Sequence, residues 1–208
     1  MIKNILFDIG GVLVSYDNEK KAREFACFSE TIPPEEFREE HVFLLPLQIR
    51  MERGEITPRE YYEEFKKVSG CRISYRHFFL IWMNNFAEIK PMIRLGRALS
   101  SRFRIYFLSN TNSLHVPGLY DLFPSLLFFH GQALSYRLGA MKPERAFFER
   151  SLAKFGLARD ECLFIDDKAR NVAGAHEYGL RAILHTDPAE TESRLVKELE
   201  AGGISLEV

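Results

Sequence analysis

A small set of charged and polar residues in this 208-residue chain could do chemistry together, because each follows a short apolar run typical of a buried strand. The set consists of Asp8, Ser109 with Asn110, Thr111 and Asn112, Lys142, and the pair Asp166-Asp167. Taken singly, each member has an ordinary alternative: Ser109-Asn110 suits a turn, Lys142 a solvated position, and Asp166-Asp167 a helix cap. Random loop composition does not place three carboxylates, a cation and a hydroxyl after separate strands.

The chemistry that suits this set is phosphoryl transfer. Converging carboxylates repel one another unless a cation lies between them, and Mg²⁺ is a hard cation that prefers oxygen ligands. Ser109 and Lys142 supply a hydrogen-bond donor and a positive charge for phosphate oxygens. Asp8 can attack phosphorus once metal and cation neutralise the approaching charge. The set predicts an aspartyl-phosphate that water then hydrolyses.

The elements that must position these residues are those of an α/β fold. Strands are predicted at residues 5–7, 105–108, 126–129, 162–165 and 181–184. Helical patterns between them, such as residues 144–155 and 169–178, imply a parallel sheet with right-handed crossovers. Such sheets bind ligands at the carboxyl ends of their strands, where Gly10 and Gly11 let the backbone turn sharply and approach a ligand.

The stretch from about residue 16 to about residue 88 shows only helical patterns and is predicted to be a helical insertion. Its clearest helix start is Thr57-Pro58-Arg59-Glu60, with Thr57 as N-cap and Glu60 completing a capping box. Other helix starts are predicted at Asp17 or Asn18, at Pro33-Pro34 and at Ser74. The predicted domains are therefore a core of residues 1–15 and 89–208 and a cap of residues 16–88.

Composition narrows the partners. Hydrophobic residues make up 46%, and 28 basic residues against 29 acidic ones leave a net charge of −1, so neither nucleic acid nor a membrane surface is an expected partner. No apolar run has membrane-spanning length, and we see no signal peptide. Cys27, Cys71 and Cys162 lack metal or redox spacing, which favours buried free thiols and a soluble, cytoplasmic protein.

Four stretches, in order, resemble the motifs of the haloacid dehalogenase superfamily: Phe7-Asp8-Ile9-Gly10-Gly11-Val12, Leu108-Ser109-Asn110-Thr111-Asn112, Met141-Lys142-Pro143-Glu144 and Phe164-Ile165-Asp166-Asp167. The resemblance covers the whole chain, with the helical block as a cap between the first two motifs. Residues 108–115, the paired aspartates and Glu52-Arg53-Gly54-Glu55-Ile56 are similar to the bacterial glucose-1-phosphate phosphatase branch. The resemblance implies a Rossmann-like, three-layer α/β/α core, a C1-type cap, Mg²⁺, and small phosphorylated metabolites as substrates.

The resemblance also implies roles for single residues. Asp8 would be the nucleophile and a metal ligand, the Gly10 carbonyl a second ligand, and Asp167 a direct ligand, with Asp166 acting through water. Lys142 would bridge phosphate and Asp8. The implied phosphate- and substrate-binding residues are Gly11, Ser109, Asn110 through its backbone, and Lys142. Asn171 stands where many members carry an acid that anchors the loop.

One position departs from the family pattern. Most of its phosphatases carry Asp two residues after the nucleophile as general acid and base, and this chain has Gly10. A positioned acid contributes about 10²–10⁴ in rate. Its loss leaves open a slow enzyme, a substrate with an easy leaving group such as a sugar 1-phosphate, or a non-catalytic phosphate-binding or regulatory protein. A dehalogenase-like hydrolase is a further alternative because it needs no leaving-group proton, although it would leave Asp166-Asp167 without a counterion.

Some residues have two interpretations each, and the sequence does not determine the oligomeric state. His115 either faces substrate or caps a helix at the surface. Arg50 and Arg53 either bind a sugar or second phosphate or lie on a solvated helix face. The aromatic residues of the insertion divide into Tyr61, Tyr62 and Phe65, which favour a core, and Phe78, Phe79 and Trp82, which could form a dimer face.

Overall fold

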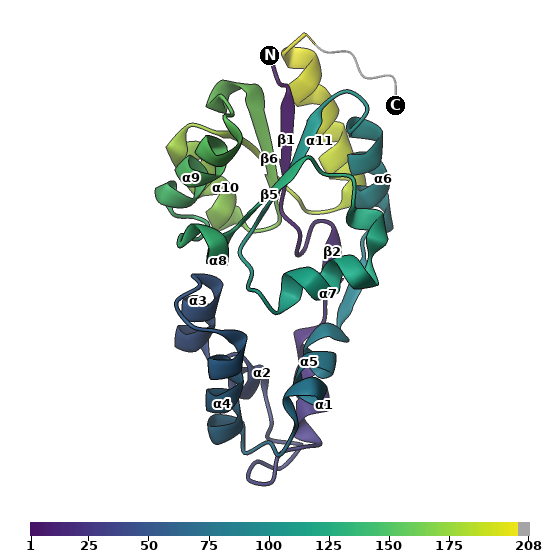
Figure 1. Cartoon of the computed structure of the whole chain (residues 1–208). Helices are drawn as coiled ribbons and strands as arrows, with labels where there is room; N and C mark the ends of the chain where they lie inside the picture. The colour runs from purple at the N-terminus through teal and green to yellow at the C-terminus, as the bar shows by residue number, and fades with distance from the viewer. Residues whose placement is uncertain (204–208) are drawn as a thin grey trace.

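The computed structural model describes residues 1–203 and holds, within them, a five-stranded parallel sheet in the order β5-β4-β1-β6-β7 (Figure 1). The strands are β1 Asn4–Phe7, β4 Arg104–Ser109, β5 Gly131–Leu134, β6 Cys162–Asp166 and β7 Arg181–Leu184. β1 lies between β4 and β6 and is buried along its whole length. The predicted α/β fold with a parallel sheet is confirmed.

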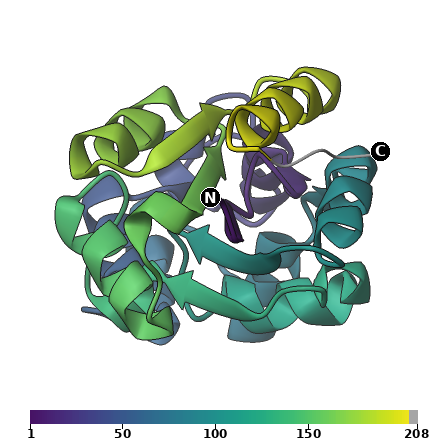
Figure 2. The same cartoon turned by 90° about the horizontal axis from the view of Figure 1, so that it is seen from above.

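Side-chain alternation gives the sheet two apolar faces, and helices cover both. Ile5 and Phe7 pack toward α6 Lys90–Leu99 and α11 Pro188–Ala201. Leu6 points the other way, toward α9 Arg145–Phe155 and α10 Ala169–Tyr178. Figure 2 shows these two helical layers on opposite sides of the sheet. Because each face of a strand is covered, the strands read as continuous apolar runs, and four of the five were predictable for that reason.

The strand predicted at residues 126–129 is wrong. A 3₁₀ turn, η1 Pro124–Leu126, occupies its start, and the strand that pairs with β4 is β5 Gly131–Leu134. Phe128 and Phe129 are apolar because they pack on Phe107, with ring centroids 5.5 and 4.6 Å away, and not because they join the sheet. β5 itself carries only two buried side chains, so its sequence signal is weak.

A helical region is inserted between β1 and β4 and lies beyond the carboxyl ends of the strands (Figure 1). Its helices are α1 Asn18–Ala26, α2 Glu39–Val42, α3 Leu45–Glu52, α4 Pro58–Ser69 and α5 Tyr75–Met83. Thr57 and Glu60 form the predicted capping box at the start of α4. Pro33-Pro34 opens a turn, not the predicted helix, and the next helix begins at Glu39.

The insertion is joined to the core by a strand pair that the sequence did not reveal. β2 Val14–Tyr16 and β3 Phe86–Glu88 pair antiparallel where the chain leaves and re-enters the core. The expectation of helices alone over residues 16–88 is therefore wrong at both ends. Each strand is three residues long, which is too short to show a periodic pattern.

Aromatic side chains form the core of the insertion. Phe25 contacts Phe65, Phe78 and Trp82 at ring-centroid distances of 4.7, 5.5 and 6.5 Å. Tyr61, Tyr62 and Phe65 are buried as predicted. The dimer-face interpretation is wrong for Phe78 and Trp82, because both are 0% exposed inside the insertion.

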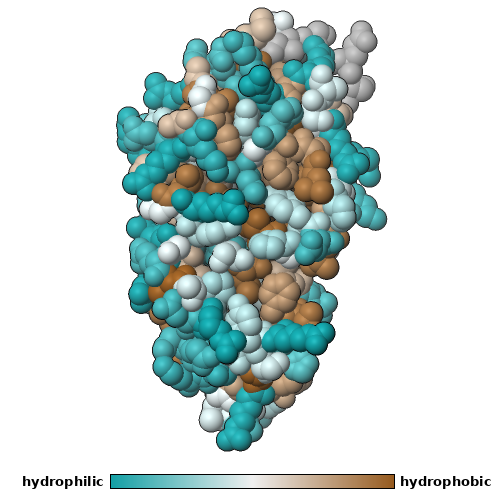
Figure 3. Space-filling model, viewed as in Figure 1, coloured by the Kyte–Doolittle hydropathy of each residue, from teal (hydrophilic) through white to brown (hydrophobic). Residues whose placement is uncertain are grey.

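The surface is mixed in character. In the space-filling view, hydrophilic residues dominate and hydrophobic residues show in patches between them (Figure 3). None of the helices in the described part of the chain combines the length and apolarity needed to span a membrane. All three cysteines are free, as predicted, but Cys27 is exposed and only Cys71 and Cys162 are buried.

Candidate active site

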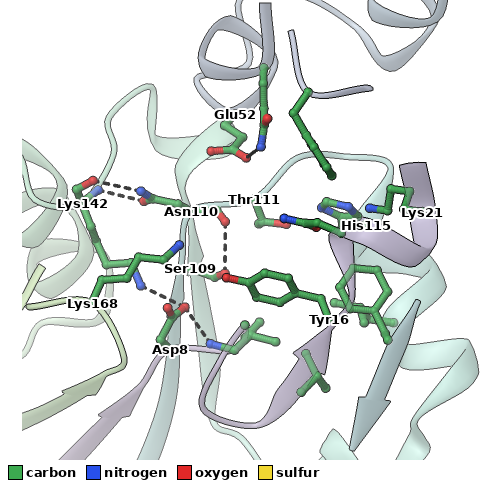
Figure 4. Close-up of a pocket in the computed structure, with 18 of the residues that line it drawn as sticks. Asp8, Tyr16, Lys21, Glu52, Ser109, Asn110, Thr111, His115, Lys142 and Lys168 are labelled. Atoms are coloured by element: carbon green, nitrogen blue, oxygen red, sulfur yellow. Dashed lines mark hydrogen bonds and ion pairs between the residues drawn. The ribbon is translucent and has the colours of Figure 1, made fainter. Parts of the chain in front are cut away.

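The predicted site residues meet at the carboxyl edge of the sheet, below a cavity of about 440 Å³ that opens between the core and the insertion (Figure 4). The core side of this cavity is lined by Asp8, Gly10, Ser109, Asn110, Thr111, Lys142, Lys168 and Asn171. Asn112 does not line it; its side chain caps α7 His115–Leu122 by accepting hydrogen bonds from two backbone amides. Parallel strands that end at one edge explain why residues from distant motifs converge.

Lys142 is the centre of the core wall. Its ammonium is fully buried and lies 2.9 Å from Asp8 Oδ1 and 2.6 Å from Asp166 Oδ2. Burial opposes this charge, but the two carboxylates outweigh it and raise the pKa of Lys142. The Asn110 side chain fixes the backbone of this lysine. Its Oδ1 accepts a 2.8 Å hydrogen bond from the Lys142 amide, and its Nδ2 donates a 2.9 Å hydrogen bond to the Lys142 carbonyl. The lysine is therefore charged and held in one place.

Asp166 is fully engaged by its neighbours. Besides Lys142, it accepts a hydrogen bond from the Lys168 backbone amide, and Asn171 Nδ2 donates to both of its carboxylate oxygens, at 2.9 and 3.1 Å. Burial alone would raise the pKa of Asp166, but these donors lower it overall, Lys142 most strongly. Asn171 therefore performs the anchoring expected at its position, and it does so as a donor where an acid would repel Asp166.

Among the described residues, the carboxylates of Asp8 and Asp167 have fewer hydrogen-bond partners than that of Asp166. Burial is the main reason that the pKa of Asp8 is raised to about 7; Lys142 lowers it, and the charges of Asp166 and Asp167 add to the rise. Asp167 Oδ1 is buried without a hydrogen-bond partner among the described residues, and burial raises the pKa of this carboxyl too. Oxygens of Asp8, Asp166 and Asp167 lie within 4.8 Å of one another. An unpartnered oxygen in a cluster of three acids fits a divalent cation.

The two glycines after Asp8 differ in what they allow. Gly11 has φ +80°, and a Cβ there would lie 2.3 Å from Asp167 Oδ2, so only glycine fits. Gly10 lines the cavity in an ordinary conformation, and a Cβ there would meet only the Tyr16 ring, at 3.4 Å. The departure from the family pattern at Gly10 is therefore not forced by backbone geometry.

The insertion side of the cavity holds a second buried lysine. Lys21 is 2% exposed, and within residues 1–203 its ammonium has neither a hydrogen bond nor an ion pair. It lies 4.4 Å from the Trp82 ring, 5.1 Å from Phe43 and 5.6 Å from Phe86. Burial lowers the pKa of Lys21 to about 7. This burial could not be predicted from the sequence, because a lysine in an amphipathic helix is usually solvated.

His115 lies beside this lysine and lines the cavity, so the surface-capping interpretation is wrong. Trp82 Nε1 donates a hydrogen bond to His115 Nε2, and the two rings stack. Burial, and then the charge of Lys21, lower the pKa of His115 well below its ordinary value. The imidazole is therefore neutral at physiological pH.

Arg50 and Arg53 do not line the cavity, which contradicts their interpretation as substrate-binding residues. Arg50 pairs with Glu55, while Arg53 crosses to the core and pairs with Glu144. The residues that do line the cavity from the insertion side, and that sequence reasoning did not select, are Tyr16, Asn18, Lys21, Glu39, Glu40, Phe43, Leu45, Gln48, Glu52 and Phe86. They come from separate helices and from the β2–β3 pair, so no local motif marks them.

Comparison with known proteins agrees with this geometry. A family model described as haloacid dehalogenase-like hydrolase matches residues 2–179. The chain belongs to this family. It is a hydrolase of the haloacid dehalogenase-like type, as its motifs predicted.

Individual relatives agree in length and fold. The chain is 25% identical to D-ribitol-5-phosphate phosphatase of Bacteroides thetaiotaomicron, over 94% of this chain and 97% of the relative. A haloacid dehalogenase family enzyme of the same organism, solved with magnesium and inorganic phosphate, superposes with a TM-score of 0.78 at 26% identity, covering 89% of this chain and 95% of that one. An L-2-haloacid dehalogenase from Xanthobacter autotrophicus, at 18% identity and a TM-score of 0.64 over 99% and 85% of the two chains, shares the fold.

Proposed function

We propose that this protein is a Mg²⁺-dependent phosphatase that hydrolyses small phosphorylated metabolites, in particular sugar and sugar-alcohol phosphates, through an aspartyl-phosphate. One observation carries the proposal: Lys142 is clamped between Asp8 and Asp166 beside the unpartnered Asp167 oxygen, on the floor of an open cavity. A buried cation and a cation-deficient acid cluster side by side suit a substrate phosphate and a metal ion.

Each residue then has a role. Asp8 attacks phosphorus, and Asp8, the Gly10 carbonyl and Asp167 hold Mg²⁺, with Asp166 acting through water. When bound, the ion neutralises charge on the carboxylates and the phosphate. Lys142 bridges phosphate and Asp8, as its 2.9 Å contact with Asp8 Oδ1 supports. The remaining phosphate-binding groups are Ser109, the Asn110 backbone and Gly11.

The cavity supports a small substrate. Its volume of about 440 Å³ is in the lower part of the usual range of roughly 300–1,000 Å³ for ligand sites. Charged and aromatic side chains face each other across it, which suits a polyhydroxylated molecule with one phosphate. The resemblance to glucose-1-phosphate phosphatases and the similarity to a ribitol-5-phosphate phosphatase both support this class, and they differ in the leaving group.

The test is a phosphate-release panel with purified protein, with Mg²⁺ and with EDTA. It covers sugar 1-phosphates, terminal sugar and sugar-alcohol phosphates, and nucleotides. We expect Mg²⁺-dependent release from the first two groups and none from the Asp8→Asn variant. No release from any ester, with Mg²⁺ and phosphate binding retained, would mean a non-catalytic binding protein. EDTA-insensitive halide release from a 2-haloacid would instead mean a dehalogenase.

A further inference from the structure

The chain lacks an acid where most phosphatases of its superfamily place one, so a phosphatase reaction at Asp8 needs its proton from elsewhere. The ring of Tyr16 lies beside Gly10, at 3.4 Å from where a Cβ would be, and no carboxylate from the core reaches over the Asp8 side of the cavity. Within the described residues, the core carboxylates near Asp8 are Asp166 and Asp167, which the proposed function assigns to the metal. The cavity's other carboxylates belong to the insertion.

The direction from which Asp8 attacks phosphorus decides which carboxylate of the insertion can give a proton to the leaving group. In phosphoryl transfer the attacking and leaving oxygens are roughly in line across phosphorus. With Asp8 attacking from the sheet edge, the leaving oxygen points away from the sheet and toward the insertion. In Figure 4, Glu52 enters the cavity from the insertion, with Ser109 and Asn110 between it and Asp8. Glu52 therefore lies on the side where the leaving group departs.

The end of α3 is docked on the core, and this holds Glu52 over the site. Next to it, Arg53 forms an ion pair with Glu144, two residues after Lys142. Gly54 has φ +74° and approaches so closely that a Cβ there would lie 2.3 Å from the Tyr136 carbonyl oxygen of α8 Ser135–Leu138. The two residues that directly follow Glu52 therefore both contact the core.

The surroundings of Glu52 suit proton transfer. Gln48 donates a 2.9 Å hydrogen bond to Oε1, which orients the carboxyl group. Burial raises the pKa of Glu52 above the usual value of a glutamate, so a larger fraction of this side chain is protonated near neutral pH. The hydrogen bond from Gln48 and the charges of Lys168, Arg170 and Lys142 oppose this rise in the pKa of Glu52. Tyr61 of α4 also faces Glu52: burial, and then the charge of Glu52, raise the pKa of the Tyr61 hydroxyl.

We propose that Glu52 is the general acid and base of this enzyme, in place of the acid missing at position 10. This inference rests on the proposed function. In the first step Asp8 forms a bond to phosphorus, the bond to the leaving oxygen breaks, and the Glu52 proton passes to that oxygen, releasing an alcohol. In the second step water attacks phosphorus, the bond to Asp8 breaks, and the Glu52 carboxylate takes a proton from the water. Inorganic phosphate leaves, and both side chains return to their starting state.

Three other groups that could donate a proton line the same cavity: Tyr16, Glu39 and Glu40. Tyr16 could donate a proton, but a hydroxyl group is a poor acceptor for the proton that water must lose in the second step. Glu39 and Glu40 are the first two residues of α2, away from the docked end of α3, and within residues 1–203 neither side chain has a hydrogen bond or ion pair that would hold it over Asp8. Tyr16→Phe, Glu39→Gln and Glu40→Gln test these alternatives directly.

The experiment measures kcat and kcat/KM, with Mg²⁺, for a series of phosphate esters whose leaving groups range from p-nitrophenol to simple alcohols. For Glu52→Gln we expect kcat/KM for alkyl phosphates to fall by about 10²–10⁴, the contribution of general acid catalysis. For p-nitrophenyl phosphate, kcat/KM should be unchanged, because that leaving group needs no proton. Its kcat should fall after a burst of p-nitrophenol, because the second step has lost its base.

Two further measurements separate this role from a structural one. Wild-type kcat/KM for alkyl phosphates should decline as pH rises and Glu52 loses its proton, and Glu52→Gln should lack that decline. Adding Gly10→Asp to Glu52→Gln should restore turnover of alkyl phosphates, because it returns an acid to the position used by most of the superfamily. Glu55→Gln is the matched control: Glu55 is an exposed neighbour outside the cavity, and its variant should behave as wild type.

The outcomes distinguish the two proposals. Wild-type protein that releases no phosphate from any ester refutes both the proposed function and the role of Glu52. Wild-type turnover that Glu52→Gln leaves unchanged across the series refutes the role of Glu52 alone. The same holds if Tyr16→Phe, Glu39→Gln or Glu40→Gln produces the steep leaving-group dependence instead. Melting temperature and inhibition by inorganic phosphate should match wild type for each variant, which shows that the fold and phosphate site are intact.

Discussion

The core side and the insertion side of the cavity, here called the core wall and the insertion wall, differ in how their buried charges are compensated. On the core wall, Lys142 lies between two carboxylates and its position is fixed by Asn110. On the insertion wall, Lys21 is equally buried, but within residues 1–203 its ammonium contacts aromatic rings and has no hydrogen bond or ion pair. Among the same residues, one hydrogen bond, from Gln48, reaches the Glu52 carboxyl group. The core wall is thus complete before substrate arrives, whereas the insertion wall holds groups whose protonation and partners depend on what enters. The charged groups at the sheet edge are therefore paired in advance, whereas those of the insertion can still gain a partner from a bound molecule.

The difference follows from how each wall is anchored. Asp8, Ser109 and Asp166 lie at or directly after β1, β4 and β6, which are paired with a neighbouring strand on both sides, so the sheet fixes their positions. Lys142 is then held against them by its ion pairs with Asp8 and Asp166 and by the two hydrogen bonds between its backbone and the Asn110 side chain. The insertion is joined to the core by a short strand pair and by contacts such as Arg53 with Glu144 and Ser125 with Glu88. Four substitutions test this comparison.

The largest effect is expected for Asp8→Asn. An amide is a poor nucleophile, so turnover of every phosphate ester should fall by about 10⁴-fold or more. The fold should survive, because Asn is nearly isosteric and removes one charge from a crowded acid cluster. Steady-state assays and a melting curve check both halves. Turnover equal to wild type would exclude Asp8 as the attacking group.

Lys142→Met should be the most destabilising change on the core wall. It leaves Asp8 and Asp166 buried without their cation, and removing one partner of a buried pair costs about 3–5 kcal/mol. Urea unfolding at pH 7 in EDTA gives the free energy of unfolding. Excess Mg²⁺ should recover part of the loss, because it supplies another positive charge. An unchanged unfolding midpoint would show that the pair is not needed for stability.

Gly11→Ala should weaken Mg²⁺ binding, because a Cβ 2.3 Å from Asp167 Oδ2 forces that carboxylate to move and strains a backbone at φ +80°. Displaced groups around metal sites typically cost about 10–100-fold in affinity. Gly156→Ala is the matched control, since Gly156 also has a positive φ, +64°, but a Cβ there meets nothing within 4 Å and lies outside the site. Isothermal titration with Mg²⁺ compares the two variants. Equal affinities would contradict the assignment of Asp167 to the metal.

The smallest effect, and the one opposite in sign to Lys142→Met, is expected for Lys21→Met. Lys21 has a pKa lowered to about 7, so below pH 7 the folded protein holds a buried charge with only cation–π support. Methionine removes that cost, and the free energy of unfolding should rise by on the order of 1–2 kcal/mol near pH 6.

The sign of the pH dependence follows from the direction of the shift. Between about pH 7 and the unfolded value of 10.5, the unfolded chain binds the Lys21 proton and the folded protein does not. Wild-type stability therefore gains with pH over this window, and the advantage of Lys21→Met should shrink between pH 6 and pH 9. Urea midpoints for both proteins at these two pH values measure it. A variant less stable than wild type at pH 6 would show that the three rings stabilise the ammonium more than burial opposes it.

Some of this protein could be predicted from its sequence by itself. β1, β4, β6 and β7 were visible because strands covered on both faces are continuous apolar runs, and the residues that follow them meet because parallel strands end at one edge. The start of α4 was visible because a capping box is local, with Thr57 and Glu60 three residues apart. The family, and with it the acid cluster and Lys142, followed from four ordered motifs.

Only the tertiary structure decided what depends on segments far apart in the chain. β5 and the β2–β3 pair are too short for a pattern and exist because a partner strand lies beside them. Lys21 and His115 read as surface residues, yet they lie in the cavity because the Trp82 ring packs between their helices. Glu52 reads as one more charge at a helix end, and its place over Asp8 comes from the docking of α3 through Arg53 and Gly54. Apolar periodicity determines which face of an element is buried, but the partner that a buried polar group finds is set by packing alone.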